Sequence, residues 1–179
     1  MEKRTAKLIV NSPGGTAGKG SKTYKISLPN SWIQEMGLDT GSKSLELSFD
    51  GKAIHIAKPE TAEEFMQSQR SLHHRLKEFL YYDGDVLCTT IYADYSRQEL
   101  AFLNHIQNHI KTAFGNNSSA MWDDFEAFLE SRCIPKSRSG IKPYLASLGL
   151  SEYDSLSIIR KTQGRMAEDH QWLEVRDIL

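Results

Sequence analysis

The sequence has little of what marks several common protein classes. Its only cysteines, Cys88 and Cys133, lie far apart and in no metal-binding or redox spacing, so a disulfide scaffold is not expected. No apolar run approaches the roughly 18 residues that a membrane-spanning helix needs, and residues 1–12 lack the apolar segment of a signal peptide. These absences predict a reduced, cytoplasmic protein with no membrane partner.

The chain also lacks an excess of either charge, since its 179 residues carry a formal net charge of only −1. The charge is unevenly distributed, however. Residues 1–25 contain a single acidic residue, Glu2, and six basic ones: Lys3, Arg4, Lys7, Lys19, Lys22 and Lys25. A basic head on an acidic remainder is typical of a protein in which one part meets phosphates.

Residues 12–24, SPGGTAGKGSKTY, superficially resemble a phosphate-binding loop of nucleotide enzymes. That loop requires four residues between its glycines and a hydroxyl residue after its lysine. Here only three residues separate Gly14 from Gly18, and Lys19 is followed by glycine. The alternating pattern of residues 22–28 predicts a strand rather than a helix. We therefore interpret the segment as a basic loop that leads into a strand.

The pattern over residues 1–59 predicts short strands and one short helix. Residues 44–49 and 53–58 alternate and are joined by Asp50-Gly51, a strong hairpin signal. So few residues provide a thin core, and small domains of this kind often gain stability by dimerising. In a homodimer with interleaved hairpins, we expect the core to contain Ile26, Leu28, Trp32, Leu45, Leu47, Ile54 and Ile56.

Residues 7–58 resemble the AbrB/MazE/SpoVT family of DNA-binding domains. The resemblance rests on KISLP (25–29), Gly37-Leu38, GSKSLEL (41–47) and Asp50-Gly51, in that order. It implies a dimeric swapped-hairpin β-barrel that contacts double-stranded operator DNA through basic residues of the first loop and strand. The matching positions here are Lys7, Lys19, Lys22 and Lys25. Tyr24-Lys25 replaces the family's usual Gly-Arg, so a bidentate arginine contact to guanine is absent.

Residues 60–80 are predicted to form a linker helix. Thr61 and Glu64 have the spacing of a capping box. The apolar stripe would contain Phe65, Leu72, Leu76, Phe79 and Leu80.

Residues 81–179 are predicted to be α-rich, with helices near 121–132 and 141–148. Residues 85–95 and 98–106 suggest a hairpin, although the second run also fits a helix. Residues 132–141 are locally basic, which suits either a phosphate-binding turn or arginines that pair with acidic helices. Residues 161–175 are expected to form a loop. No nucleophile, cofactor loop or metal-ligand set is recognisable, so neither an enzyme nor a cofactor or metal site is expected.

The C-terminal part also resembles a segment of the accessory region that precedes the kinase core in HipA-like proteins. The matching positions are Trp122, Arg132, Ile134, Pro135, Ser137, Arg138, Leu148, Gly149, Asp169 and Trp172. This resemblance implies a role in binding a protein partner. Candidate partner-binding residues are Trp122, Arg132, Arg138, Arg165 and Trp172.

Taken together, the patterns predict an α+β protein. A swapped-hairpin β-barrel (1–59) would be followed by a linker helix (60–80) and a mainly α domain with a small hairpin (81–179). We expect a DNA-binding regulator of the antitoxin type that represses its own operon and holds a toxin. Two alternatives remain open. One is a mobile-element inhibitor of a host or defence enzyme. The other is a ligand-responsive transcription factor with a pocket lined by Trp122, Tyr144 and Trp172.

Overall fold

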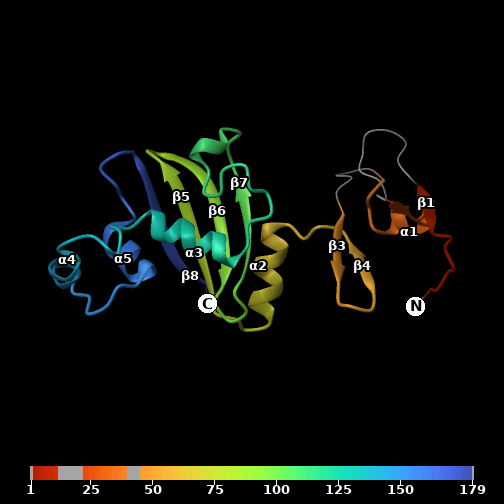
Figure 1. Cartoon of the computed structure of the whole chain (residues 1–179), viewed down its shortest axis with the longest axis horizontal. Coiled ribbons are helices and arrows are strands. Elements are labelled where there is room, and N and C mark those ends of the chain that lie inside the picture. The colour runs from red at the N-terminus through yellow and green to blue at the C-terminus, as the bar shows by residue number, and fades with distance from the viewer. Residues whose placement is uncertain (1, 12–21, 40–44, 179) are drawn as a thin grey trace. The chain divides into compact units, whose positions relative to one another are not determined.

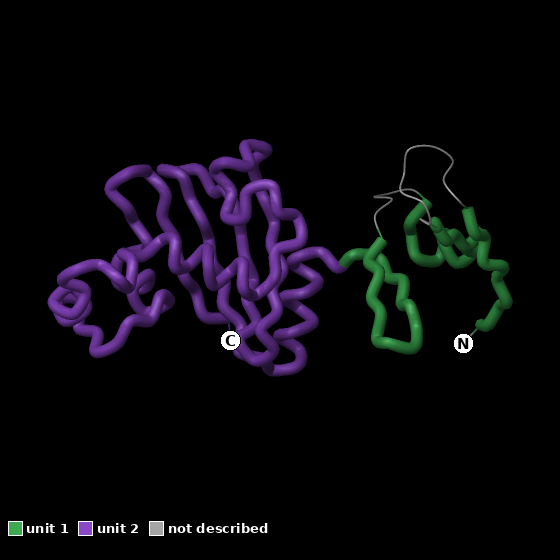
Figure 2. Tube along the Cα trace, viewed as in Figure 1, with its two compact units in different colours: residues 1–59 green, residues 60–179 purple. Residues whose placement is uncertain are grey.

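The computed structural model describes residues 2–11, 22–39 and 45–178, which divide into two compact units, Met1–Pro59 and Glu60–Leu179 (Figure 2). We call them unit 1 and unit 2. The described residues form a mixed α+β structure with antiparallel sheets, as the sequence predicts. Within this part of the chain, no helix is both long and apolar enough to cross a membrane.

Within its described residues, unit 1 contains two separate two-stranded sheets and one helix (Figure 1). Strand β1 (Ile9–Asn11) pairs with β2 (Thr23–Lys25), and β3 (Glu46–Phe49) pairs with β4 (Ile54–Ala57); helix α1 spans Asn30–Glu35. In the described part of a single chain these sheets do not close into a barrel, so the barrel remains a prediction about the dimer.

The predicted Asp50-Gly51 hairpin is confirmed. The Asp50 carboxylate accepts hydrogen bonds from the backbone N–H groups of Lys52 and Ala53, both at 2.8 Å. Gly51 has a φ of 90°, which a residue with a Cβ rarely adopts. These two residues therefore fix the turn and, with it, the β3–β4 register.

Unit 2 is built on a four-stranded antiparallel sheet in the order β7-β6-β5-β8 (Figure 1). The strands are β5 (Leu76–Asp83), β6 (Val86–Asp94), β7 (Glu99–Asn104) and β8 (Gln171–Ile178). The β6–β7 hairpin confirms the strand interpretation of residues 98–106 over the helical one.

Helices cover the two faces of this sheet unequally. Helix α3 (Trp122–Ser131) crosses one face, where it packs with α5 (Ser155–Thr162) over the main core (Figure 1). Phe79, Ile91, Phe125 and Ile158 have no exposed surface there. On the other face, Phe65 of α2 (Ala62–Ser71) packs with Tyr92. The remaining helical elements are α4 (Ile141–Ser147) and the short 3-10 helix η1 (His109–Lys111).

The prediction of a single linker helix over 60–80 is wrong beyond Ser71. The capping box of Thr61 and Glu64 is confirmed, but α2 ends at Ser71, and residues 76–80 belong to β5. At the boundary, His73 has a positive φ of 58°, and His74 Nδ1 lies 2.6 Å from a carboxylate oxygen of the fully buried Asp94. Strand β5 lies between two neighbours and is buried on both faces, so its apolar residues do not alternate and imitate a helical stripe.

Two further corrections concern residues 81–179. This segment is not mainly α with a small hairpin, because it contributes three strands and the end of a fourth to the sheet. The loop expected over 161–175 is also wrong from Gln171 onward, since Gln171–Ile178 form β8 and pair with β5. That pairing joins segments far apart in the sequence, which local patterns do not reveal.

Candidate nucleic-acid interface and partner surface

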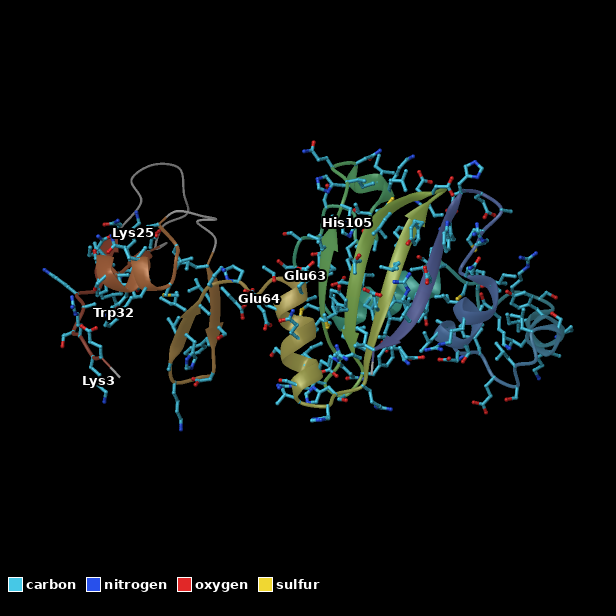
Figure 3. All side chains as sticks on the ribbon, turned by 180° about the vertical axis from the view of Figure 1, so that it is seen from behind. Lys3, Lys25, Trp32, Glu63, Glu64 and His105 are labelled. Carbon is cyan, nitrogen blue, oxygen red and sulfur yellow. The ribbon has the colours of Figure 1, made fainter. Side chains whose placement is uncertain are left out.

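The predicted DNA-contacting lysines lie around the β1–β2 ribbon of unit 1. Lys25 is on β2 opposite Ile9, Lys22 directly precedes β2, and Lys7 lies two residues before β1. All three lysines are exposed, and Lys25 is labelled in Figure 3. Lys19 lies outside the described residues. The structure thus brings three of the four predicted lysines to one ribbon.

None of these three lysines has an ion-pair partner within the described residues. Arg4 differs, because its guanidinium pairs with Glu2 at 2.9 Å and lies 5.8 Å from the centre of the Trp32 ring. The Trp32 indole N–H also donates to Glu2. Lys7, Lys22 and Lys25 are therefore available for phosphate groups, whereas Arg4 is already neutralised.

The β1–β2 ribbon has two different faces. Val10 pairs with Tyr24, and both side chains are apolar and about half exposed, at 49% and 58%. Lys25 and Ile9 form the next pair and project from the opposite face, because successive residues of a strand alternate. The ribbon consequently presents the apolar Val10–Tyr24 pair on one side, and Lys25 beside Ile9 on the other.

The β3–β4 hairpin also has an apolar face. Leu47 pairs with Ile56 and Phe49 with Ile54, so these four side chains lie on one side. Leu47, Phe49 and Ile54 are 66%, 70% and 69% exposed. Among the described residues of unit 1, only Leu38 is buried.

The predicted dimer core is thus largely uncovered in one chain. Four of its residues are exposed and three are half-buried. The exposed residues are Ile26, Leu45, Leu47 and Ile54, and the half-buried ones are Leu28, Trp32 and Ile56. Leaving these side chains in water would forfeit about 1.5–3 kcal/mol for each large one.

In unit 2, Arg132 lies inside the protein rather than on a partner surface. Its guanidinium donates to both carboxylate oxygens of Asp169, at 2.6 and 2.9 Å, to the carbonyl of Gly164 and to Gln171. The residue is only 7% exposed. Hydrogen bonding to Arg132 lowers the pKa of Asp169. Arg132 therefore does not suit the predicted role of a direct partner contact, because its donors join α3 to the segment before β8.

Arg165 and Trp172 do come together at the surface. The Arg165 guanidinium lies 4.8 Å from the centre of the Trp172 ring, and that ring stacks on Tyr82 with centroids 4.4 Å apart. The Trp172 indole N–H donates to the Gly84 carbonyl at 2.7 Å. In this Tyr82–Trp172–Arg165 stack, Arg165 and Trp172 border a hollow of about 290 Å³ that Asp169 and His170 also line.

The other two candidates lie elsewhere. Arg138 is exposed in the turn after α3, where its N–H donates to the Pro135 carbonyl. Trp122 borders a different cavity beside Tyr95. Trp122, Tyr144 and Trp172 do not line a common pocket among the cavities of the described residues, so the structure offers no support for the predicted ligand pocket.

Two residues of these surfaces were missed at the sequence level. Tyr82 meets its aromatic neighbour Trp172 only through the pairing of β5 with β8, which lies far away in the sequence. Tyr95 was placed at the end of a strand and given no role. Neither lies in a recognisable motif, because each obtains its partners through the tertiary fold.

No family model, curated protein or solved structure matches this chain. Within the described residues, no three His, Cys, Asp or Glu side chains gather as a metal site would require.

Proposed function

We propose that the chain is a DNA-binding transcriptional regulator of the antitoxin type. In this proposal, two copies join through residues 1–59 as a swapped-hairpin barrel, and the dimer binds operator DNA. Residues 60–179 hold a partner protein, such as a toxin or a host enzyme. The resemblance of residues 7–58 to AbrB/MazE/SpoVT domains supplies the family expectation.

The observation that carries the proposal is the exposed apolar surface of unit 1. Its two small sheets and the residues next to their strands display nine large hydrophobic side chains that are 39–70% exposed: Leu8, Ile9, Val10, Tyr24, Ile26, Leu45, Leu47, Phe49 and Ile54. Apolar residues this concentrated mark an interaction site. A second copy supplies the same surface, and a two-fold interface is self-complementary.

The basic ribbon supports the choice of DNA as the ligand. Lys25 projects from the face opposite Val10 and Tyr24, so dimer formation through the apolar face leaves Lys25 exposed. In a two-fold dimer, each ribbon lysine then occurs twice, as the half-sites of an operator do. Lysines at these positions contact phosphates as point charges, which favours affinity over base discrimination.

Support for a protein partner comes from the Tyr82–Trp172–Arg165 stack. Tyrosine, tryptophan and arginine dominate the energetic centres of protein interfaces. The three side chains hold one another in place through ring stacking and a cation–π contact, so little conformational entropy is lost when a partner binds.

The test is a titration of the full chain on its own upstream DNA over a range of salt concentrations. We expect the logarithm of the binding constant to fall steeply with the logarithm of salt concentration, by about 0.9 for each phosphate contact. Lys22→Ala/Lys25→Ala should flatten this slope. Lys52→Ala/Lys58→Ala, which removes the same charge outside the β1–β2 ribbon, should leave it nearly unchanged. Equal slopes for both double variants would refute the ribbon as the DNA-binding site.

A further inference from the structure

The cavity beside Trp122 has features that the proposed regulator function does not use. It has a volume of about 300 Å³ and lies against α3 and the start of α5. This volume is at the lower end of the range for ligand sites. It suits a small molecule or one inserted side chain.

Aromatic rings form one wall of this cavity. Tyr95 and Trp122 meet edge to face, with ring centroids 5.1 Å apart, and Phe125 lies 5.2 Å from Trp122 and 6.4 Å from Tyr95. Trp122 and Tyr95 are only partly buried. Ring faces of this kind attract cations through their quadrupole, tryptophan most strongly.

Three carboxylates, those of Glu126, Glu130 and Asp154, also line the cavity, together with Leu129, Tyr153, Ser155 and Leu156. Glu126 accepts a hydrogen bond from the Trp122 indole N–H at 3.0 Å, and Asp154 accepts one from the Ser157 backbone N–H at 2.8 Å. The side-chain carboxylate of Glu130 has no hydrogen-bond or ion-pair partner among the residues that the structure describes, although its backbone carbonyl accepts from the Cys133 N–H. Against these three acids the lining has one cation, Lys136, which lies 5.9 Å from the centre of the Tyr153 ring. The cavity thus favours a positively charged occupant.

Tyr95, which lines the cavity, has a hydroxyl with an unused hydrogen-bonding capacity. Its oxygen is buried and has no hydrogen-bond partner in the described part of the chain. Burial also raises the pKa of this phenol, so the hydroxyl keeps its proton and can donate or accept. An unsatisfied buried hydroxyl costs about 1–3 kcal/mol. A small shift of the Tyr95 side chain that brings this oxygen to the cavity would let a ligand's hydrogen-bonding group remove that cost.

A second hollow continues from the cavity. It has a volume of about 510 Å³ and shares Glu130, Lys136 and Tyr153 with the first. A ligand whose charged end enters the first cavity therefore has room for a further part along the turn that follows α3.

We infer that this cavity binds an organic cation, either a guanidinium or an alkylammonium group. The Trp122 ring contacts the face of the cation, because the Tyr95 ring already has the Lys77 ammonium 5.5 Å from its centre. The carboxylates of Glu126 and Glu130 neutralise the cation. The source of the cation is either a free small molecule or an arginine or lysine side chain of a peptide segment. The inference concerns unit 2 alone and does not depend on DNA binding by unit 1.

Calorimetric titration of the full chain tests this inference with matched pairs of probes. Propylguanidinium is compared with its neutral isostere propylurea, and a capped Gly-Gly-Arg-Gly-Gly peptide with the same peptide carrying citrulline. We expect each cation to bind at least about tenfold more tightly than its neutral counterpart, since a desolvated cation–π contact alone contributes about 2 kcal/mol. Tighter binding by the arginine peptide than by propylguanidinium assigns the site to a peptide side chain, and the reverse assigns it to a free cation.

Variants separate the site from a general effect of charge. Glu130→Gln should weaken cation binding by roughly threefold to fivefold, whereas Glu168→Gln, which removes the same charge at an exposed position outside the cavity lining, should have no effect. Tyr95→Phe should weaken binding by roughly fivefold without lowering the melting temperature, because the lost hydroxyl has no partner within the protein. Equal binding of charged and neutral probes would overturn the inference. So would cation binding that neither Glu130→Gln nor Tyr95→Phe alters.

Discussion

The hydrogen-bonding positions of the Arg132 guanidinium are all used inside unit 2. Five hydrogen bonds connect it to Gly164, Asp169 and Gln171. Gly164 has a φ of 60°, and a Cβ at that position would lie 3.1 Å from the Arg132 Cβ. Arginine and glycine thus fit together here, which explains why polar residues gather around Gly164 in the sequence.

At this residue scale we predict that Asp169→Asn destabilises unit 2 by about 2–3 kcal/mol at neutral pH, because it leaves a buried guanidinium without its counter-charge. Glu99→Gln is the control, since its ion pair with Arg97 is exposed to water and should contribute about 1 kcal/mol or less. Chemical denaturation of both variants measures the difference. Equal losses of unfolding free energy in the two variants would contradict the conclusion that the Arg132–Asp169 pair stabilises unit 2 as a buried ion pair.

The same pair gives a defined pH dependence. The pKa of Asp169 is lowered in the folded state, so its contribution is fully present above the unfolded pKa of about 4 and is lost as pH falls through the folded pKa. The stability gap between the wild type and Asp169→Asn should therefore stay constant near neutral pH and narrow below about pH 4. Denaturation at a series of acidic pH values checks this, and a gap that widened with acidity would contradict it.

At the scale of elements, β5 organises unit 2, because it pairs with β6 on one side and β8 on the other. Phe79 of this strand has no exposed surface, and its ring contacts that of Phe125 on α3 at 5.1 Å. The strand therefore ties the sheet to its helical cover.

We predict that Phe79→Ala destabilises unit 2 by about 3–5 kcal/mol, through lost burial and the cavity left behind. Leu103→Ala on β7, where the side chain is 40% exposed, should cost about 1 kcal/mol or less. Thermal unfolding of the two variants makes the comparison. A small loss of unfolding free energy in Phe79→Ala would contradict the account. It would mean that residues 76–80 lie outside the core, as they would in a solvent-exposed linker helix.

Sequence patterns identified the elements whose signals are local. The Asp50-Gly51 hairpin, the Thr61–Glu64 capping box and the helix over 122–131 each follow from neighbouring residues. Strands β5 and β8 were missed for different reasons. Burial on both faces removed the alternation of β5. In β8, Leu173 and Val175 do alternate with Glu174 and Arg176, but its partner strand lies far away in the sequence.

Among the candidate site residues, those in local motifs could be predicted from the sequence, whereas those whose contacts depend on the tertiary fold could not. Lys22 and Lys25 were found because they lie in a local motif, and the structure leaves both exposed. Arg132 was placed on the partner surface because charge alone does not distinguish a buried arginine from an exposed one. Tyr82 and Tyr95 were not selected, since the ring stack and the cavity exist only once the sheet and helices have assembled.

At the scale of the whole molecule, the two units differ in how they bury apolar residues. Unit 2 has a continuous core between its sheet and α3, whereas only Leu38 is buried among the described residues of unit 1. Unit 2 can therefore be stable within one chain. Unit 1 requires a further surface, which in the proposed function is a second copy.

The claim that unit 1 joins two copies is tested most directly by sedimentation equilibrium. This experiment measures the mass of the full chain for the wild type, Leu47→Glu and Ile110→Glu. Leu47 is 66% exposed on the apolar face of β3–β4, and Ile110 is 90% exposed on unit 2, so neither change disturbs a buried position of a single chain. We predict that the wild type and Ile110→Glu are dimers. The dimer of Leu47→Glu should be at least tenfold weaker, because burying an unpaired charge in the interface costs well over 1.4 kcal/mol. A monomeric wild type, or a Leu47→Glu variant that dimerises as tightly as the wild type, would contradict the account.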